Sequence, residues 1–431
     1  MRIEWRSLDS AADAAALAAD VRALAPAPDD VAGAVAEIVE AVRARGDAAV
    51  AEYTRRFDTR GAEPKPLRVG RDEAEAALAA LDPEVRAALE LAAANVEAVA
   101  LAGLGEDIEV PLPQGQTVLV RELPIGRAAI YVPGGRAPYP STVVMGAVTA
   151  RAAGVGEVVV CAPPGDDGEL HTTILAACAL CDVDSVYRMG GAQAVAALAF
   201  GTETVAPVDV VVGPGNVYVQ EAKRQLSQRV GIDGFAGPSE LLVVLAGSGA
   251  RPARPVALDL LAQGEHGVES LVAAVAPDAG ILRALGEDLE SLAPARPTVA
   301  AAAAVLVQAA DVEAALAFAQ ALAPEHVQLV GSEAEALAPL VTRAGCVFVG
   351  RSSATAFGDY VAGSNHVLPT GGAARFASPL GPATFRRRTT EVRVEGAARD
   401  LAGAGAALAR AEGFVVHAQS MEARVQENGV P

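Results

Sequence analysis

Short runs of β-branched residues alternate with alanine-rich segments along most of this chain, and this alternation restricts the fold more than any other feature. In the first series, each short run is followed by a segment long enough to form a helix. The sequence predicts strands at 128–132, 157–161, 185–187 and 209–212, and helices at 141–153, 170–180, 192–200 and 217–226. Strands and helices that alternate at this length are typical of a parallel sheet covered on both faces.

A second series of the same kind follows. Its predicted strands are 241–245, 271–275, 305–307, 327–330 and 346–349, and its helices end near 262, begin at 279 and span 312–322. Two successive series of similar size predict two related domains, and the lack of a fixed short period argues against a solenoid. The expected fold class is α/β, with two incomplete Rossmann-like parallel-sheet domains and smaller N- and C-terminal helical or extended segments.

The two ends of the chain differ from this alternation. Apolar residues recur at helical spacing between 22 and 57, where Asp29 and Asp30 can cap the start, and Gly46 followed by Asp47 predicts a helix end and a new N-cap. The other predicted elements are a helical tract at 71–102 that breaks near Asp82 and Pro83, a strand-like stretch at 391–394 and a helix from 397 onward. The N-terminal part is therefore expected to be mostly helical.

Composition and charge exclude several classes of protein. The chain has 431 residues and is 52% hydrophobic, which is enough for two or more domains with large cores. Its formal net charge of −19 argues against a nucleic-acid partner, because phosphate contacts need clustered Lys and Arg. No apolar run reaches the roughly 18 residues of a membrane-spanning helix. The N-terminus, MRIEWRSLDS, lacks the apolar core of a signal peptide, so we expect a cytoplasmic protein with no membrane partner.

The cysteines do not indicate a disulfide framework or a metal site. The chain has four, too scattered for a set of bridges. Cys178 and Cys181 form a CxxC pair inside the apolar run TILAACALC, where a redox or metal role would require a second pair. We expect both to pack in a core, as free cysteines commonly do.

The dinucleotide-binding fingerprint is missing. Pairs of the form G-x-G occur at Gly154 and Gly156 and at Gly213 and Gly215, but neither is followed by the third glycine. This weakens the usual Rossmann dehydrogenase interpretation on motif grounds.

Three glycine-containing segments are nevertheless candidates for ligand binding. YVPGG at 131–135, GPGNVY at 213–218 and GPSEL at 237–241 are each expected to end a strand, where ligands collect in open α/β sheets. The helix expected near Ser141 offers its N-terminus to a pyrophosphate. Glycines that only form turns are the alternative.

Histidine is scarce, and most histidines stand beside carboxylates or amides. The chain has five, of which His171 opens a predicted helix and is expected at the surface. The other four are His266, His326, His366 and His417. A single histidine is more often structural or exposed than functional, so the argument depends on what surrounds each one.

Two of these surroundings suggest metal binding and proton transfer. Gln263 and His266, in LLAQGEHG, are three residues apart and share a helix face, and an imidazole nitrogen suits Zn²⁺. Glu325 and His326 follow Pro324 at the mouth of a strand, and such a pair can activate water and accept a proton. Neighbouring residues of a regular strand point to opposite faces, so the two can act at one site only if this corner is irregular.

The remaining two histidines also have acidic neighbours. Asp359 and His366 lie in AFGDYVAGSNHVLPTGG, expected to be a glycine-punctuated loop of the kind in which functional residues concentrate. Glu412 and His417 lie in AEGFVVHAQS near the C-terminus. An ordinary loop and an exposed tail helix are the alternatives.

Taken together, these segments resemble the histidinol dehydrogenase family, in family order and through nearly the whole chain. The segments that carry the resemblance are VRARGDAAVAEYTRRFD, IYVPGGRAPYPSTVVMGAVTARAAGV, GGAQAVAALAFGTETV, VGPGNVYVQEAKRQL, IDGFAGPSELLVV, DLLAQGEHG, APEHVQL, FGDYVAGSNHVLPTGG and EGFVVHAQS. One such motif would be weak, but nine in order are specific.

The resemblance implies a reaction and its residues. Family enzymes oxidise L-histidinol to L-histidinaldehyde and then to L-histidine, consuming two NAD⁺. It implies that one Zn²⁺ is bound by Gln263, His266, Asp359 and His417. The metal would orient the substrate through the imidazole and amino nitrogens of histidinol. His326 would be the general base in both steps, and Glu325 would activate the water that attacks the aldehyde.

Further contacts and an assembly follow from the same resemblance. Substrate would touch Ser239, Glu412, His326 and the four metal ligands, and NAD would touch Tyr131, Gln193 and Asn216. His366 would have a supporting role. Family enzymes are intertwined homodimers, so Glu412 and His417 would complete the partner's site.

The same comparison suggests a division of the chain into four parts. These are an N-terminal segment at 1–24, a first Rossmann-like domain with a helical start and the NAD-binding side at 25–235, a second one with the metal and catalytic residues at 236–380, and a tail domain at 381–431.

Three other functions stay open on the sequence. The chain can be a related dehydrogenase for another small alcohol such as a sulfonated diol, a zinc hydrolase in which Glu325 activates water, or a silent metabolite-binding protein. Ser239, Glu412 and the complete metal set favour histidinol, and the presence of both Glu325 and His326 disfavours a silent protein.

Overall fold

The structure is a computed structural model, and it describes residues 1–24, 30–134, 137–235, 237–251, 254–300 and 302–427. The chain forms two compact units. The first comprises Met1–Gly103 and Gly126–Phe385, and the second comprises Leu104–Ile125 and Arg386–Pro431.

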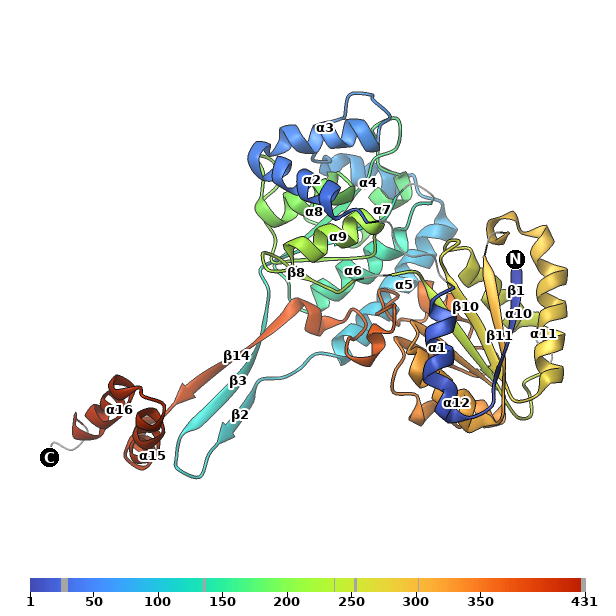
Figure 1. Ribbon diagram of the computed structural model, residues 1–431. Coiled ribbons are helices and arrows are strands. Elements are labelled where there is room, and N and C mark those ends of the chain that lie inside the picture. The colour runs from blue at the N-terminus through green and yellow to red at the C-terminus, as the bar shows by residue number, and fades with distance from the viewer. Residues whose placement is uncertain (25–29, 135–136, 236, 252–253, 301, 428–431) are drawn as a thin grey trace. The chain divides into compact units, whose positions relative to one another are not determined.

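The first unit contains a parallel sheet in the order β6-β5-β4-β7-β8, and Figure 1 labels its edge strand β8. Its strands are β4 (Arg127–Tyr131), β5 (Glu157–Ala162), β6 (Ser185–Arg188), β7 (Val210–Val212) and β8 (Gly231–Ile232). All neighbours pair in parallel. Strand addition changes direction between β4 and β7, which makes this point the topological switch of the sheet.

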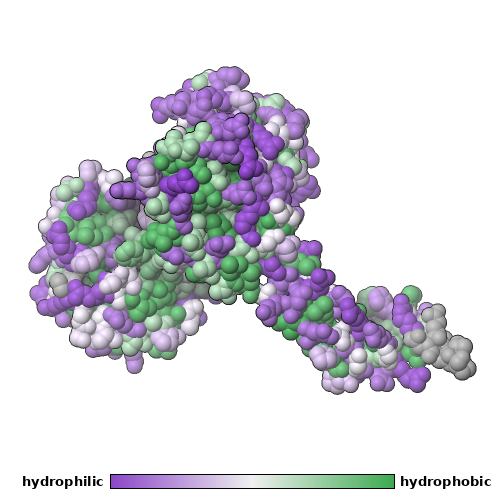
Figure 2. Space-filling model, turned by 180° about the vertical axis from the view of Figure 1, so that it is seen from behind, coloured by the Kyte–Doolittle hydropathy of each residue, from purple (hydrophilic) through white to green (hydrophobic). Residues whose placement is uncertain are grey.

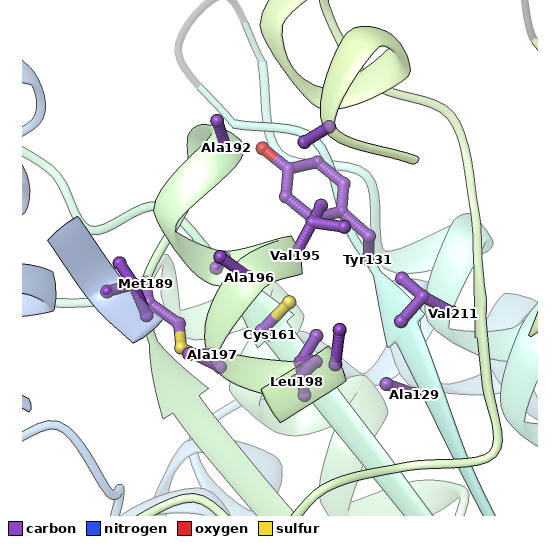
Figure 3. Close-up of a cluster of buried hydrophobic side chains, with 14 of the residues drawn as sticks. Ala129, Tyr131, Cys161, Met189, Ala192, Val195, Ala196, Ala197, Leu198 and Val211 are labelled. Carbon is purple, nitrogen blue, oxygen red and sulfur yellow. The ribbon is translucent and has the colours of Figure 1, made fainter. Parts of the chain in front are cut away.

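Helices cover both faces of this sheet, because its central strands are buried on both sides. The helices are α2 (Ala32–Arg45), α3 (Asp47–Phe57), α4 (Arg71–Ala79), α5 (Pro83–Ala102), α6 (Pro140–Ala152), α7 (Thr172–Leu180), α8 (Gly191–Phe200) and α9 (Val217–Leu226). Helices α2, α3, α8 and α9 enclose one core with β4 and β5, and the alanine-rich α8 lies at its centre (Figure 3). Helices α4 to α7 pack against one another, and α6 contacts β4 and β5.

A second parallel sheet in the same unit has the order β1-β11-β10-β9-β12-β13. Its strands are β1 (Arg2–Leu8), β9 (Glu240–Leu245), β10 (Leu271–Ala276), β11 (Ala303–Ala309), β12 (His326–Val330) and β13 (Cys346–Val349). Helices α1 (Ala14–Arg22) and α12 (Val312–Leu322) pack on one face. Helices α10 (Arg254–Gly264) and α11 (Ala279–Leu292) pack on the other. The predicted α/β class, with two parallel sheets, is confirmed.

The strand β1 was not predicted, since the N-terminal part was expected to be mostly helical. It pairs in parallel with β11 along its whole length, from Arg2 opposite Ala303 to Leu8 opposite Ala309. Only Leu8 in this strand is fully buried, because β1 is an edge strand. An edge strand with one covered face lacks the continuous apolar run that identified the central strands.

Shorter elements complete the first unit. They are α13 (Ser332–Glu335), α14 (Thr355–Tyr360) and the 3-10 turns Ala11–Asp13, Ala293–Ala295, Pro297–Val299, Ala338–Leu340, Ala373–Arg375 and Pro382–Phe385. Asp359 therefore lies on a short helix, which corrects the loop expected there.

The second unit is an antiparallel sheet and a helix pair. The sheet has the order β14-β3-β2, with β2 (Ile108–Pro111), β3 (Thr117–Pro124) and β14 (Arg386–Arg393), and the helices are α15 (Ala398–Ala411) and α16 (Val415–Glu427). Glu395–Ala397 forms a 3-10 turn before α15. The predicted strand-then-helix tail is confirmed, although its strand begins earlier, at Arg386. Neither β2 nor β3 was predicted.

The caps near the N-terminus differ in detail from the prediction. Gly46, at φ +53°, ends α2 and is itself the N-cap of α3. Asp47 is the first residue of α3, and its backbone N–H donates to Glu203 at 2.8 Å. Asp30 accepts from the N–H of Ala32 at 3.1 Å, whereas Asp29 lies outside the described residues.

Two expectations from composition can be compared with the fold. Cys178 and Cys181 are buried, and all four cysteines are free, so the prediction of core packing is confirmed. In the part of the chain that the structure describes, no helix combines the length and apolarity needed to cross a membrane.

Candidate active site

A large cavity opens at the carboxyl ends of the first sheet. Its volume is about 1120 Å³, and it is lined by Tyr131, Gln193 and Asn216 together with residues of the α3 end and the loop after β5. Tyr131 is the last residue of β4, Gln193 lies in the first turn of α8, and Asn216 is the N-cap of α9. The three residues that were expected to contact NAD thus face one space, at the switch point of the sheet.

Local hydrogen bonds fix two of these side chains. The backbone N–H of Gly191 donates to the Tyr131 hydroxyl oxygen at 3.0 Å, and burial raises the pKa of Tyr131 above its usual value. The side-chain oxygen of Asn216 accepts from the N–H groups of Tyr218 at 3.1 Å and Val219 at 3.2 Å. The first residues of α8 and the start of α9 line the cavity, and a helix start suits an anionic group.

A buried ion pair holds the loop that carries Asn216. Lys223 is fully buried, and its ammonium donates to Asp233 at 2.7 Å and to the Gly213 carbonyl at 2.5 Å. The N–H of Gly213 donates to the other oxygen of Asp233 at 2.7 Å. Gly213 has φ +112°, and a Cβ there would lie 2.1 Å from the Tyr131 carbonyl oxygen. Only glycine fits this close approach of β7 to β4.

Asp58 is a cavity residue that the sequence analysis did not single out. It follows α3 at the end of the quoted segment TRRFD, lines the cavity and accepts from Gln193 at 3.4 Å. Burial raises its pKa to about 7. The only sequence signal was its place in a segment of the resemblance.

A second cluster of polar residues lies at the amino ends of the second sheet. Glu240 is the first residue of β9 and His326 is the first residue of β12, and these strands are neighbours. GPSEL therefore begins a strand, which corrects the expectation that it ends one: the preceding strand β8 stops at Ile232. Ser239 precedes β9, and its carbonyl accepts from the N–H of Leu271 at 2.9 Å.

The corner before β12 is irregular, as a shared site for Glu325 and His326 requires. Helix α12 ends at Leu322, Ala323 takes a left-handed conformation at φ +43°, and Pro324 follows. Glu325 lies outside the regular strand, so the strand rule of opposite faces does not apply to it. A carboxyl oxygen of Glu325 lies 3.6 Å from Nδ1 of His326.

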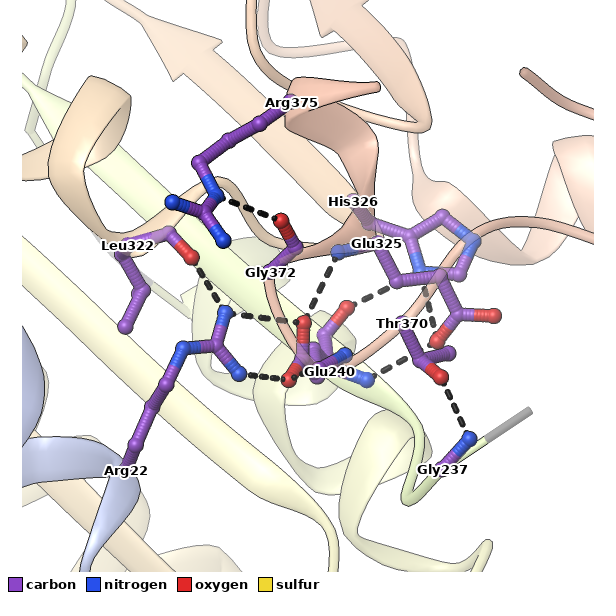
Figure 4. A network of polar contacts seen from close by, with 10 residues as sticks. Arg22, Gly237, Glu240, Leu322, Glu325, His326, Thr370, Gly372 and Arg375 are labelled. Carbon is purple, nitrogen blue, oxygen red and sulfur yellow. Dashed lines mark hydrogen bonds and ion pairs between the residues drawn. The ribbon is translucent and has the colours of Figure 1, made fainter. Parts of the chain in front are cut away.

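The surroundings of His326 determine which ring nitrogen is available. Its Nδ1 lies 3.0 Å from the backbone carbonyl oxygen of Glu240 (Figure 4). A carbonyl only accepts, so Nδ1 carries the proton and Nε2 keeps its lone pair. Nε2 lies 3.9 Å from a carboxyl oxygen of Asp359. Burial lowers the pKa of His326 to about 4, and the ring is therefore neutral at pH 7.

The two carboxyl groups nearest His326 are shifted in the opposite direction. Burial raises the pKa of Glu325 well above its usual value, and the charges of Glu240 and Asp359 add to this shift. Burial likewise raises the pKa of Asp359 to about 6. A bound cation would favour the ionised form of these carboxyl groups and so offset the effect of burial.

The first unit offers three donors for such a cation. Gln263 is 2% exposed, and its side-chain nitrogen has no hydrogen-bond partner within the described residues. His266 lies just beyond the end of α10 and is exposed, and it interacts electrostatically with His326 and His366. Asp359 faces the same ring from α14. Among the described residues, no three of His, Cys, Asp or Glu are arranged to hold a metal ion.

The three donors of the first unit have the chemistry of a partial zinc site. Imidazole nitrogen and carboxylate oxygen are ordinary zinc ligands, and the unpartnered amide of Gln263 is a buried polar group that needs a partner. An amide can turn so that its oxygen takes the place of its nitrogen. Only two of the three donors, His266 and Asp359, are imidazole or carboxylate ligands, so a further donor is required.

His366 contacts the backbone of Asp359. Its Nδ1 donates to the backbone carbonyl of Asp359 at 2.9 Å, and its Nε2 lies 3.1 Å from the hydroxyl of Thr142 on α6. Burial lowers the pKa of His366 to about 4. Both ring nitrogens are occupied, which agrees with the supporting role expected for this residue and leaves no lone pair for a ligand.

Glu412 and His417 belong to the second unit. Glu412 is the C-cap of α15, and His417 lies on α16 with its ring 5.2 Å from that of Phe414. Both side chains are exposed. Phe414, Val415 and Val416, which precede His417, are also exposed.

Comparisons with known proteins decide the family. The sequence model of the histidinol dehydrogenase family matches residues 24–425. The chain belongs to the histidinol dehydrogenase family. It is 44% identical to histidinol dehydrogenase of Aromatoleum aromaticum over 91% of both chains. It is also 44% identical to that of Parasynechococcus marenigrum, over 92% of this chain and 91% of the relative.

A solved structure agrees with this membership. The crystal structure of histidinol dehydrogenase from Elizabethkingia anophelis superposes with a TM-score of 0.92 at 30% identity, and 99% of each chain is covered. Like other members of the histidinol dehydrogenase family, the chain is thus an oxidoreductase with the α/β fold described above.

Proposed function

We propose that this chain oxidises L-histidinol to L-histidine through L-histidinaldehyde in cytoplasmic histidine biosynthesis, with one zinc ion per site and two NAD⁺ per turnover. The observation that carries the proposal is the corner of Glu325 and His326. One residue there has an ionisable carboxyl, and the other has an imidazole whose free nitrogen faces Asp359. The proposed reaction needs both groups, because a base must remove the alcohol proton and a second base must activate a water molecule.

His326 would act first as a proton acceptor. It is neutral at pH 7, and its tautomer leaves Nε2 able to take the hydroxyl proton of histidinol while a hydride leaves the carbinol carbon. The same nitrogen would serve again when the hydrated aldehyde loses its second hydride. Burial excludes bulk water from the ring, so the proton passes directly between substrate and base.

Glu325 would act in the second half of the reaction. One of its oxygens accepts from the N–H of Glu240 at 2.8 Å, and the other oxygen is left for a water molecule. The raised pKa makes this carboxylate a stronger base once it is ionised. It would take a proton from the water whose oxygen bonds to the aldehyde carbon, and the carboxylic acid product acquires its second oxygen in this way.

Two bound groups would complete the chemistry. Zinc, when held by Gln263, His266, Asp359 and His417, supplies a Lewis acid and a fixed point for the substrate nitrogens. NAD⁺, when held by Tyr131, Gln193 and Asn216, supplies the acceptor for each hydride. Ser239 and Glu412 would contact substrate beside the metal ligands.

The second unit supports an intertwined dimer. The α15–α16 pair buries a small cluster of Ala406, Ala409 and Ala418, with Met421 packed against it. Val416 is 74% exposed and Phe414 is 53% exposed, and Figure 2 shows many hydrophobic residues on the molecular surface. So small a core stabilises little by itself, and exposed apolar residues next to His417 call for a covering surface. A partner subunit would provide it and receive Glu412 and His417 in return.

The proposed activity is tested by the stoichiometry of NADH formation. Purified, zinc-loaded protein mixed with L-histidinol and excess NAD⁺ should form two NADH and one L-histidine per histidinol. NADH only with another small alcohol would replace the substrate, and hydrolysis without NADH would indicate a zinc hydrolase. A protein that binds histidinol without forming NADH would be catalytically silent.

The shared site is tested by complementation between two inactive chains. Co-expressed H326N and H417A chains should form hybrid dimers that regain activity, because the H417A core and the H326N tail build one intact site. Restoration would fail if each chain supplied its own His417. Zinc content per site, measured on H417A alone, should fall below that of the wild type.

A further inference from the structure

Glu240 is a buried carboxylate that several separate segments of the chain hold in place. It is 3% exposed. One oxygen accepts from the N–H of Gly371 at 3.1 Å and from Arg22, and the other accepts from the N–H of Glu325 at 3.2 Å (Figure 4). Burying a carboxylate is expensive unless it is paired and hydrogen-bonded. The resemblance gave Glu240 no role, although it stands in GPSEL next to Ser239.

The backbone of Glu240 contacts both reacting side chains. Its N–H donates to the carboxyl of Glu325 at 2.8 Å, and its carbonyl accepts from Nδ1 of His326 at 3.0 Å. Glu240 and Glu325 therefore exchange two hydrogen bonds, each through its own side chain and the other's backbone. We propose that Glu240 is a positioning residue which, held by Arg22, fixes the catalytic corner. This inference rests on the proposed function.

Arg22 connects the two sides of that corner. It lies in the last turn of α1, and its guanidinium binds Glu240 and also donates to the carbonyl of Leu322, the last residue of α12. The chain then turns through Ala323 and Pro324 into Glu325. Because the guanidinium is a rigid fork, it holds the start of β9 and the end of α12 at a set separation. A purely structural ion pair would stabilise the fold without controlling the rate.

The test compares R22K, R22M and E240Q with a matched control, R151M. Arg151 also binds one carboxylate, that of Asp184 at 2.6 Å, and two backbone carbonyls, those of Asp182 at 2.6 Å and Gly156 at 3.4 Å. Its side chain is 29% exposed, and that of Arg22 is 26% exposed. R151M therefore removes an arginine–carboxylate pair from the other sheet, where no reacting group depends on it; its carboxylate, Asp184, is 38% exposed, whereas Glu240 is 3% exposed.

We expect R22M and E240Q to lower kcat about 10–100-fold for both oxidation steps, with R22K intermediate. The KM for NAD⁺ and the zinc content should stay within about twofold of the wild type. R151M should lose less thermal stability than R22M, because the carboxylate that it leaves unpaired is partly exposed, and its kcat should be unchanged. This split distinguishes positioning from stabilisation, because a loss of stability alone would leave the kcat of folded R22M unchanged, as in R151M.

The inference is overturned if folded R22M or E240Q retains the wild-type kcat, or if R151M loses kcat as they do. Should both fail to fold, R22K decides: a lowered kcat with unchanged KM supports positioning, and a wild-type kcat refutes it. A wild-type protein that forms no NADH from histidinol would refute the proposed function and this inference together. Active wild type with equally active variants would refute the inference alone.

Discussion

The two parallel sheets of the first unit have the same strand order but carry their polar clusters at opposite ends. Apart from the edge strand β1, each follows the order third, second, first, fourth and fifth along its own segment of chain. In one sheet the cavity lies beyond the carboxyl ends of β4 and β7. In the other, Glu240 and His326 stand at the amino ends of β9 and β12. Topology locates the switch point in both sheets, but it does not decide which end carries the site.

Helix polarity gives a physical reason for the difference. Helices begin at the carboxyl ends of parallel strands, where their N–H groups and positive dipole ends favour an anion such as a pyrophosphate. At the amino ends the helices finish, and their carbonyls and negative dipole ends favour a cation. Gln263 and His266 lie where α10 ends, and Leu322 ends α12. The proposed NAD site and metal site therefore each match the charge of the helix ends beside them.

The largest effect should come from removing the base. H326N should lower the rates of both oxidation steps by about 10²–10⁴-fold, since it removes the lone pair that is proposed to accept the hydroxyl proton. The proposed NAD⁺ site belongs to the other sheet, so NAD⁺ binding should be unchanged in an equilibrium titration. Rapid-quench measurement of each half-reaction checks the first expectation. Retention of either half at the wild-type rate would contradict a shared base.

E325Q should affect one half-reaction more than the other. Glutamine can still accept from the N–H of Glu240, but it cannot take a proton from water. We expect aldehyde oxidation to slow about 10²-fold, while alcohol oxidation falls much less. Mixing with histidinol and trapping the aldehyde should then show its accumulation. Equal losses in both halves would mean that the division of roles between Glu325 and His326 is wrong.

The ion pair of Lys223 and Asp233, beside the proposed NAD site, should control the KM for NAD⁺, whereas the ion pair of Arg22 and Glu240 should control kcat. D233N removes the charge that Lys223 and the N–H of Gly213 share. A hydrogen bond to a charged group contributes about 1.5–3 kcal/mol, so the KM for NAD⁺ should rise about 10–100-fold. The kcat at saturating NAD⁺ and the zinc content should stay near wild type. If D233N lowers kcat and leaves this KM unchanged, the comparison between the two sheets fails.

The sequence was sufficient for the buried strands and the covering helices, but not for the exposed strands or for which end of a strand carries the site. Buried central strands such as β5 are continuous apolar runs, and helices such as α9 have clear caps, so both could be predicted. The edge strand β1 and the second unit's β2 and β3 are partly exposed and lack that signal. GPSEL was placed at the wrong end of a strand, because glycine and proline mark a turn without showing whether a strand ends or begins there.

The residues of the candidate site could also be predicted only in part from the sequence. Histidines and their acidic neighbours were recognisable because they are scarce in this chain. Arg22 and Glu240 are far apart in sequence, and neither belongs to a motif of its own, so only the folded chain brings them together. Lys223 is one of only two lysines, which was a usable signal. Asp58 became notable only through its burial in the cavity.

The smallest expected effect is a pH-dependent change in melting temperature that depends on Asp58, a residue beside the first sheet. Its folded-state pKa of about 7 lies above the ordinary value of 3.8, so the folded chain holds this proton more tightly than the unfolded chain does. The resulting stability is present below pH 3.8 and is lost as the pH rises to about 7.

D58N keeps a neutral side chain that can accept from Gln193, so its melting temperature relative to wild type should increase from pH 5 to pH 8, by about 2 °C or more. Differential scanning calorimetry at the two pH values measures this, and a difference that is equal at both would show that Asp58 does not titrate in this range. Zinc content should not change, because the residue belongs to the sheet whose helix ends favour an anion.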